Sequence, residues 1–284
     1  MIEISHLDFR YKRTQVFNNI NLRFEKGMIY GLLGENGVGK TTLLKIITGL
    51  QNPQAGSCIV DGQRSFDRLP ETMQKVFFLP DAVELPEDHT PEKYLKELLP
   101  FYPKSSMNDF YSLMQELHVE PQRKFKEMSF GQQKKSLLAV ALCLGTDYLL
   151  LDEPTNGLDI PSKADLRRVL SGRINDDTCI IISTHQVKDV ENLIDPIVIL
   201  TQNDVLLNAS VATITEKLFF EYGGEQRKEA LYSEMQPDGY MNVMVNDNMG
   251  ESQINIEALF NAVLRNAEQV KRLFAQQNNP TPMA

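Results

Sequence analysis

The sequence contains no apolar segment long enough to cross a membrane. Its longest uninterrupted apolar run, LLAVALCL (137–144), is far shorter than the roughly 18 residues that a spanning helix needs. The first residues, MIEISHLDFRYKR, are interrupted by charge and resemble neither a secretory signal nor a transit peptide. We therefore expect a soluble chain whose only contact with a membrane is through a partner.

Cysteine is scarce, and the chain has no excess of positive charge. Cys58, Cys143 and Cys179 are odd in number and lack CxxC spacing, which favours buried free thiols in a reducing cytosol over disulfides or a metal site. Asp and Glu total 38 against 29 Lys and Arg, so the formal net charge is -9. Because nucleic acid is itself anionic, we expect no nucleic acid partner.

What the chain does contain is a regular succession of short apolar segments and helical segments. Residues 1–25 alternate between apolar and polar positions, which indicates strands. The later strand segments are MIYGLLG (28–34), KVFFLP (75–80), YLLLDEP (148–154) and TCIIISTH (178–185), and helical segments include TTLLKIITGL (41–50) and SKADLRRVLSGRI (162–174). This order predicts an α/β fold with a mainly parallel sheet buried on both faces.

Two regions differ from this pattern. From about residue 82 to residue 127, apolar residues recur at helical spacing between prolines, which predicts a small helical insert. Near the carboxyl end, INIEALFNAVLRNAEQVKRLF (254–274) predicts one amphipathic helix. Its apolar face contains Ile256, Leu259, Phe260, Val263, Leu264, Val270 and Phe274. We expect this face to pack on its own domain, with a dimerising or regulatory role as the alternative, and we expect the final AQQNNPTPMA to be disordered.

The segment GENGVGKT fits the pattern G-x-x-x-x-G-K-[ST] between a predicted strand and a predicted helix. Its glycines allow successive backbone N–H groups to face a polyphosphate, Lys40 supplies a point charge, and Thr41 supplies a hydroxyl for Mg²⁺. The alternative is a glycine-rich turn without a ligand. The residues expected to contact nucleotide are Gly34, Glu35, Asn36, Gly37, Val38, Gly39, Lys40, Thr41 and Thr42.

Polar residues follow two of the apolar strands. YLLLDEP places Asp152 and Glu153 at the carboxyl end of a strand, where open parallel sheets bind ligands. We expect Asp152 to hold Mg²⁺ and Glu153 to orient or deprotonate the attacking water. His185 follows the strand CIIIST, the third after those that precede the phosphate loop and Asp152, and is expected to contact the γ-phosphate. The alternatives are a solvated strand end or a helix cap for the acids and a solvent-facing histidine.

A second anion-binding device precedes the apolar run at residue 137. A helix beginning near Gln132 leaves backbone N–H groups free at its start. Ser129 adds a hydroxyl, Gly131 permits close approach, and Gln132 adds an amide. Simple N-capping by Ser129 is the alternative, and it would account for the serine alone.

Together these motifs resemble those of the nucleotide-binding subunits of ABC transporters over residues 1 to about 210. MSFGQ is similar to the signature motif of that family, LLLDEP to its Walker B motif, NGLD (156–159) to its D-loop and STH to its H-loop. The resemblance implies an ABC-type P-loop NTPase with an antiparallel β subdomain and a helical insert, followed by an extension at 211–284. It also implies that two such domains meet head to tail around ATP and Mg²⁺. By the same resemblance Tyr11 is expected to stack on adenine, unless it is an ordinary strand residue, and Asp159 to lie at the nucleotide.

The sequence departs from the family pattern at two positions. Phe130 replaces the first of two signature glycines, which restricts the backbone there. Asp81 stands where the resemblance places a glutamine. A carboxylate there retains the ability to bind Mg²⁺, so Asp81 is expected among the metal ligands, although it adds negative charge beside a triphosphate.

The function implied by the resemblance is ATP hydrolysis that powers a separate integral-membrane permease, with an export-type subunit as the nearest match. Its partners would be that permease and a second ATP-binding subunit, identical or different. The chain would then be cytoplasmic and peripheral on the inner face of the cell membrane. A soluble ABC-type ATPase without a channel and a nucleotide-binding regulator without turnover are the alternatives.

Overall fold

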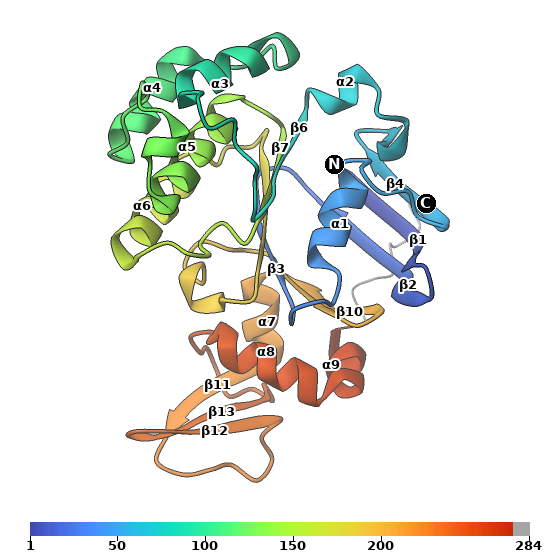
Figure 1. The fold of residues 1–284 in the computed structure, drawn as a ribbon. Coiled ribbons are helices and arrows are strands. Elements are labelled where there is room, and N and C mark those ends of the chain that lie inside the picture. The colour runs from blue at the N-terminus through green and yellow to red at the C-terminus, as the bar shows by residue number, and fades with distance from the viewer. Residues whose placement is uncertain (275–284) are drawn as a thin grey trace.

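Six strands form the sheet at the centre of the molecule (Figure 1). They are β3 (Ile29–Leu33), β6 (Val76–Leu79), β7 (Tyr148–Asp152), β8 (Cys179–Thr184), β9 (Ile197–Thr201) and β10 (Asp204–Ala209). Their spatial order is β10-β9-β3-β8-β7-β6, and all neighbours are parallel except β10, which is antiparallel to β9. The computed structural model describes residues 1–274. Every residue of β3, β7 and β8 is buried, which confirms the predicted parallel sheet with two covered faces.

A second sheet lies beside the central one and is antiparallel. It contains β1 (Ile2–Tyr11), β2 (Thr14–Phe24), β4 (Ala55–Val60) and β5 (Gln63–Arg64) in the order β2-β1-β4-β5. Helix α1 (Lys40–Ile47) packs between the two sheets, because Phe17 of β2, Leu43 of α1 and Leu150 of β7 belong to one buried cluster (Figure 1). A short 3-10 turn, η1 (Ser65–Asp67), and helix α2 (Pro70–Met73) lead from this sheet to β6.

The region between β6 and β7 is helical, as the sequence predicts. It contains α3 (Pro91–Leu98), η2 (Leu99–Phe101), α4 (Met107–Glu116), η3 (Phe125–Glu127) and α5 (Phe130–Cys143). Side chains of Thr90 and Ser106 cap α3 and α4 by accepting backbone N–H groups, which satisfies part of each helix start. Leu95 and Phe110 pack with Val140 of α5 in a core of their own. Helix α6 (Ile160–Ser171) follows β7, and the short turn η4 (Val187–Asp189) follows β8.

The carboxyl-terminal part contains more regular structure than the sequence indicates. After α7 (Val211–Lys217) comes an antiparallel sheet of β11 (Leu218–Gly223), β13 (Gly239–Val245) and β12 (Tyr232–Gln236), in that spatial order. Helices α8 (Ile256–Arg265) and α9 (Ala267–Phe274) then return to the central sheet (Figure 1).

The prediction of a single helix over 254–274 is wrong, because the helix breaks at Asn266. The Asn266 side chain donates one hydrogen bond to the Leu231 carbonyl (2.6 Å) and another to the Ala262 carbonyl (3.2 Å). Asn266 itself leaves the helical conformation, with φ -128° and ψ 40°. Such a side chain competes with the helical backbone for hydrogen bonds, and here it turns α9 away from α8.

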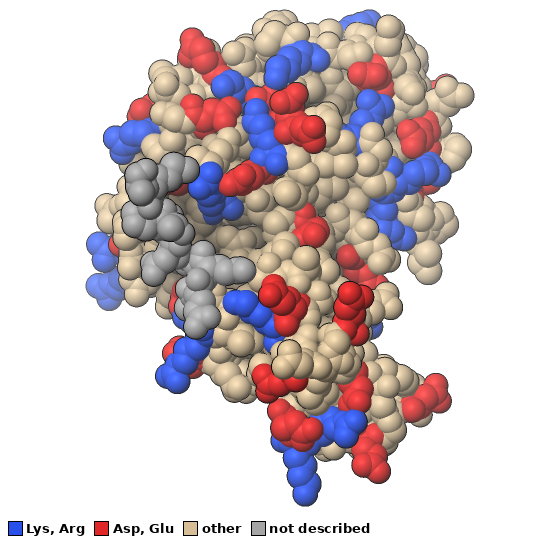
Figure 2. Space-filling view, turned by 180° about the vertical axis from the view of Figure 1, so that it is seen from behind, with Lys and Arg blue, Asp and Glu red and all other residues tan. Residues whose placement is uncertain are grey.

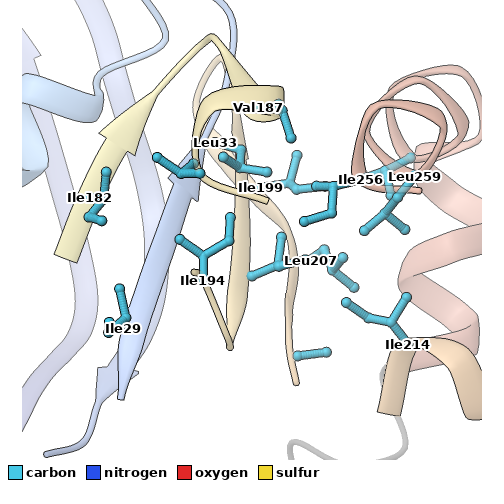
Figure 3. Close-up of a cluster of buried hydrophobic side chains, with 14 of the residues drawn as sticks. Ile29, Leu33, Ile182, Val187, Ile194, Ile199, Leu207, Ile214, Ile256 and Leu259 are labelled. Carbon is cyan, nitrogen blue, oxygen red and sulfur yellow. The ribbon is translucent and has the colours of Figure 1, made fainter. Parts of the chain in front are cut away.

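The apolar face of these helices packs on the core of the same chain, as expected. Figure 3 shows Ile256 and Leu259 of α8 facing Leu207 of β10 and Ile199 of β9. The expected disorder of AQQNNPTPMA concerns residues that lie outside the described part of the chain.

Within residues 1–274, no helix has both the length and the apolar character required to cross a membrane. Figure 2 shows basic and acidic side chains interspersed over one face of the molecule.

Candidate functional site: a phosphate loop at the carboxyl edge of the central sheet

The loop between β3 and α1 has a backbone that only glycine adopts readily. Gly37 and Gly39 have φ angles of 84° and 112°. A Cβ on Gly39 would lie 2.6 Å from Val16 Cγ1 and 2.8 Å from a carbon of the Phe17 ring, so β2 leaves no room for one. Helix α1 begins directly after Gly39 without a side-chain cap. Its first N–H groups are therefore available to an anion.

Lys40 is buried beneath this loop. Its Nζ donates to the Gly34 carbonyl (2.7 Å) and the Glu35 carbonyl (3.2 Å), and it lies 3.6 Å from Glu153 Oε1. Burial lowers the pKa of Lys40, while the nearby carboxylates of Glu153 and Asp152 oppose that shift. The loop carbonyls and Glu153 thus hold an ammonium group at the place where the sequence predicts phosphate.

Asp152 ends β7 and is 5% exposed. Thr41 Oγ1 donates to its Oδ2 at 2.7 Å, and Ser183 Oγ donates to its Oδ1. A hydroxyl and a carboxylate in contact are hard oxygen donors of the kind that Mg²⁺ prefers, alongside phosphate oxygens and water. Thr41 and Asp152 therefore fit a Mg²⁺ site. Ser183 was not predicted from the sequence, because its contact with Asp152 depends on the pairing of β7 with β8.

Glu153 has a backbone conformation that is unusual for a residue other than glycine. Its φ is 47°, in the left-handed region, a conformation that costs of order 1–3 kcal/mol and persists only where the surroundings hold it. Thr184 Oγ1 donates to Glu153 Oε2 at 3.1 Å, and His185 Nδ1 lies 2.8 Å from Oε1. With Lys40 at 3.6 Å, both carboxylate oxygens are held between α1 and the end of β8. Strained backbone at such a position is a recognised property of functional sites.

The structure therefore brings together five of the residues predicted from sequence. These are Lys40, Thr41, Asp152, Glu153 and His185, which meet where β3, β7 and β8 end. Parallel strands deliver their carboxyl ends to one edge of a sheet, which is why residues so far apart in sequence converge.

Ser129 and Gln132 lie in a different arrangement, a reciprocal cap at the start of α5. Ser129 Oγ accepts the Gln132 N–H (3.3 Å), and Gln132 Oε1 accepts the Ser129 N–H (3.0 Å). The capping alternative therefore explains both residues, and not the serine alone. A Cβ on Gly131 would meet only Leu158, at an ordinary contact distance of 3.7 Å. Among the described residues, no hydrogen bond or ion pair joins Ser129 or Gln132 to the phosphate loop.

Asp159 and Tyr11 also lie away from the phosphate loop contacts. Asp159 caps α6 by accepting the Ser162 N–H at 2.9 Å, and hydrogen bonds from Ser162 lower the pKa of its carboxyl. Tyr11 ends β1 with 43% of its surface exposed and meets Phe9 edge-on at 4.8 Å. Its ring is accessible to a planar ligand.

Asp81 forms hydrogen bonds with two residues that were not predicted as site residues. Lys134 Nζ donates to Asp81 Oδ1 at 2.8 Å, and Asn156 Nδ2 donates to Oδ2 at 3.1 Å. The Phe130 ring packs on Gly157, where a Cβ would lie 2.6 Å from the ring, and it also lies 5.3 Å from Lys134 Nζ. Sequence spacing offered no signal for Lys134, because its partners belong to other segments.

Comparison with known proteins agrees with this geometry. A family model described as "ABC transporter" matches residues 17–156. The ABC transporter ATP-binding protein YtrB of Bacillus subtilis (strain 168) is 30% identical over 206 residues, which cover 72% of this chain and 70% of YtrB. The lantibiotic transport ATP-binding protein SrtF of Streptococcus pyogenes is 29% identical over 235 residues, covering 82% of this chain and 96% of SrtF.

A solved structure of a bacterial ABC transporter cassette, MJ0796, described as dimeric, has the same fold. The TM-score is 0.66 at 22% identity, over 74% of this chain and 99% of the cassette. The phosphate loop, the acidic strand end and the sequence relatives agree: the chain belongs to the family of ABC transporter ATP-binding proteins.

Proposed function

We propose that this protein binds and hydrolyses ATP with Mg²⁺ and thereby powers a separate integral-membrane permease. The observation that carries the proposal is the convergence of Lys40, Thr41, Asp152, Glu153 and His185 at one edge of the central sheet. A phosphate loop without this acidic edge would bind nucleotide but would offer no group to act on water.

Each residue has a role that follows from its position. Lys40 and the free N–H groups of α1 hold the terminal phosphates, and Thr41 with Asp152 holds Mg²⁺, which neutralises phosphate charge when bound. Glu153 orients a water molecule and accepts a proton from it as the water oxygen bonds to the terminal phosphorus and the bond to ADP breaks. His185 keeps the Glu153 carboxylate in place through Oε1, the same oxygen that Lys40 approaches.

We further propose that the complete site needs a second subunit, placed head to tail. The start of α5 has no hydrogen bond or ion pair to the phosphate loop within residues 1–274, and Gly131 lacks a packing reason in this chain. Phe130 and Ile160, the first residues of α5 and α6, have 55% and 83% of their surfaces exposed, so covering them with a second subunit would bury apolar area. A partner subunit that covers this face would bring the nucleotide on its phosphate loop against the signature segment of this chain. The dimeric description of MJ0796 supports this arrangement.

The permease is proposed from the family and from the names of relatives. SrtF is named for lantibiotic transport and SkfE of Bacillus subtilis for peptide export, so we propose an export-type system. The chain would work at the inner face of the cell membrane, bound to the permease. We retain residues 1–210 as the ATPase unit and 211–284 as its extension, as part of the same proposal.

Replacing Glu153 with glutamine tests the catalytic role. Glu153→Gln should bind ATP as tightly as the unaltered protein, lose about 100-fold or more in hydrolysis rate and accumulate an ATP-bound dimer. Phosphate release and size-exclusion chromatography with ATP measure these effects. Glu216→Gln, at an exposed position on α7, is the matched control and should be fully active. Full turnover in Glu153→Gln would remove the catalytic assignment.

Purification from membranes in detergent tests the permease. A tagged chain should bring down a membrane protein with several spans, and the complex should hydrolyse ATP faster than the chain alone. If the tagged chain is purified without a membrane protein and still hydrolyses ATP, a soluble ABC-type ATPase is the better description.

A further inference from the structure

The side chain of Lys134 uses all three of its hydrogen-bond donors on two other segments of the chain. An ammonium group has three N–H donors. In Lys134 they meet Asp81 Oδ1 at 2.8 Å, the Asn156 carbonyl at 2.8 Å and the Glu153 carbonyl at 3.2 Å. The side chain is only 12% exposed, so these contacts replace water almost completely. Such a saturated ammonium fixes the three groups relative to one another.

The three acceptors come from two parts of the fold, the segment after β6 and the turn after β7. Lys134 is the fifth residue of α5, Asp81 lies two residues after the end of β6, and Glu153 directly follows β7. Asn156 lies in the turn before α6 and reinforces the cluster, because its side chain donates to Asp81 and its N–H donates to the Glu153 carbonyl at 3.1 Å. One largely buried charge therefore links α5 and the segment after β6 to the strand end that carries the proposed catalytic carboxylate.

The contact with Glu153 is made to the main chain, at the residue whose backbone is strained. The peptide group of Glu153 is held on one side by its own N–H, which donates to the Ser183 carbonyl at 2.9 Å. On the other side its carbonyl accepts from Lys134 and from the Asn156 N–H. These bonds fix the left-handed φ of 47°, and that conformation directs the carboxylate toward Lys40 and His185.

We propose that Lys134 is a positioning residue for Glu153, and that Asp81 serves chiefly as its charge partner. This proposal rests on the proposed ATPase function. Asp81 neutralises the largely buried ammonium of Lys134, and the ammonium holds the main chain of Glu153 so that the carboxylate stays aligned for water. This assigns Asp81 a role different from the metal ligand expected from sequence.

The two carbonyl contacts of Lys134 distinguish a positioning role from that of a purely structural ion pair. If the ion pair only adds stability, the reversed pair Asp81→Lys with Lys134→Asp should restore its effect. If Lys134 positions Glu153, the reversed pair should not restore activity, because an aspartate at 134 has no donor for the Glu153 and Asn156 carbonyls. Lys134→Arg keeps the charge and the donors and should retain activity.

The experiment measures ATP hydrolysis and ATP affinity in the full chain, with its membrane partner if one copurifies. Lys134→Met should lower kcat at least tenfold and change KM for ATP less than threefold, Lys134→Arg should stay within threefold of the unaltered protein, and the reversed pair should be as slow as Lys134→Met. Lys126→Met, which breaks the exposed 2.7 Å pair with Asp88, is the matched control and should be fully active.

A double variant tests whether Lys134 acts through Glu153. In a Glu153→Gln background, single-turnover hydrolysis should slow less than twofold when Lys134→Met is added, because residues that act as a unit give non-additive losses. Independent tenfold loss in that background would overturn the proposal, as would full activity of Lys134→Met or of the reversed pair. If Lys134→Met fails to fold, Asp81→Asn carries the test, with a smaller loss of kcat, about threefold, at unchanged KM. An inactive unaltered protein would instead contradict the proposed function.

Discussion

At the scale of single residues, the site consists of a few charged side chains in contact at the edge of the central sheet. Lys40 and Asp152 are buried, and Glu153 lies between Lys40 and His185. Burial lowers the pKa of Lys40, because its ammonium group is poorly solvated. A bound polyanion would stabilise this ammonium by its charge and by the hydrogen bonds that it accepts. Nucleotide affinity should therefore depend strongly on this one side chain.

Removing the Lys40 ammonium should weaken ATP binding about 10-fold to 100-fold, since hydrogen bonds to charged groups contribute about 1.5–3 kcal/mol. Lys40→Ala is compared with Lys45→Ala, which removes a lysine from the last turn of the same helix. Titration with a fluorescent ATP analogue measures both affinities. Equal affinity in Lys40→Ala and in the unaltered protein would contradict the phosphate-loop assignment.

The same scale shows why some site residues could be predicted from sequence and others could not. Lys40, Thr41 and the Asp152–Glu153 pair lie in contiguous motifs whose spacing is imposed by the phosphate loop and the strand end. Ser183 meets Asp152 across 31 positions of sequence, and Lys134 meets Asp81 across 53. These partners are set by tertiary packing, which residue spacing does not encode.

At the scale of elements, regular patterns predicted the helical insert and four strands of the central sheet, namely β3, β6, β7 and β8. Strands β9 and β10 and the carboxyl-terminal sheet were not predicted. Strand β12, YSEMQ, buries only its first residue, so it lacks the alternation that marks a half-buried strand. The break between α8 and α9 could not be predicted from the sequence for another reason. Apolar spacing continues through Asn266, but its side chain bonds to Leu231, a residue of a distant segment.

Asn266→Ala should lower the free energy of unfolding by about 1–2 kcal/mol, because the Leu231 carbonyl loses its donor, although alanine favours helix at this position. Chemical unfolding followed by circular dichroism measures this change, with exposed Gln269→Ala of α9 as the control. An Asn266→Ala variant at least as stable as the unaltered protein would show that this side chain does not hold the corner between the helices.

At the scale of the whole molecule, one buried core joins the central sheet to the carboxyl-terminal helices. Leu33 of β3, Leu207 of β10 and Leu259 of α8 all belong to it (Figure 3). The first residues of α5 and α6, Phe130 and Ile160, lie outside this core and are exposed. We place the second subunit against this part of the surface.

The most direct test of this account mixes two inactive proteins. Lys40→Ala chains have a damaged phosphate loop and an intact signature segment, whereas Ser129→Arg chains have the reverse. If each nucleotide is held between two chains, mixed dimers contain one intact composite site, and hydrolysis should reappear at up to about half the activity per dimer of the unaltered protein. Hydrolysis that stays at the level of the separate variants at every mixing ratio, while mixed dimers are shown to form, would contradict the account.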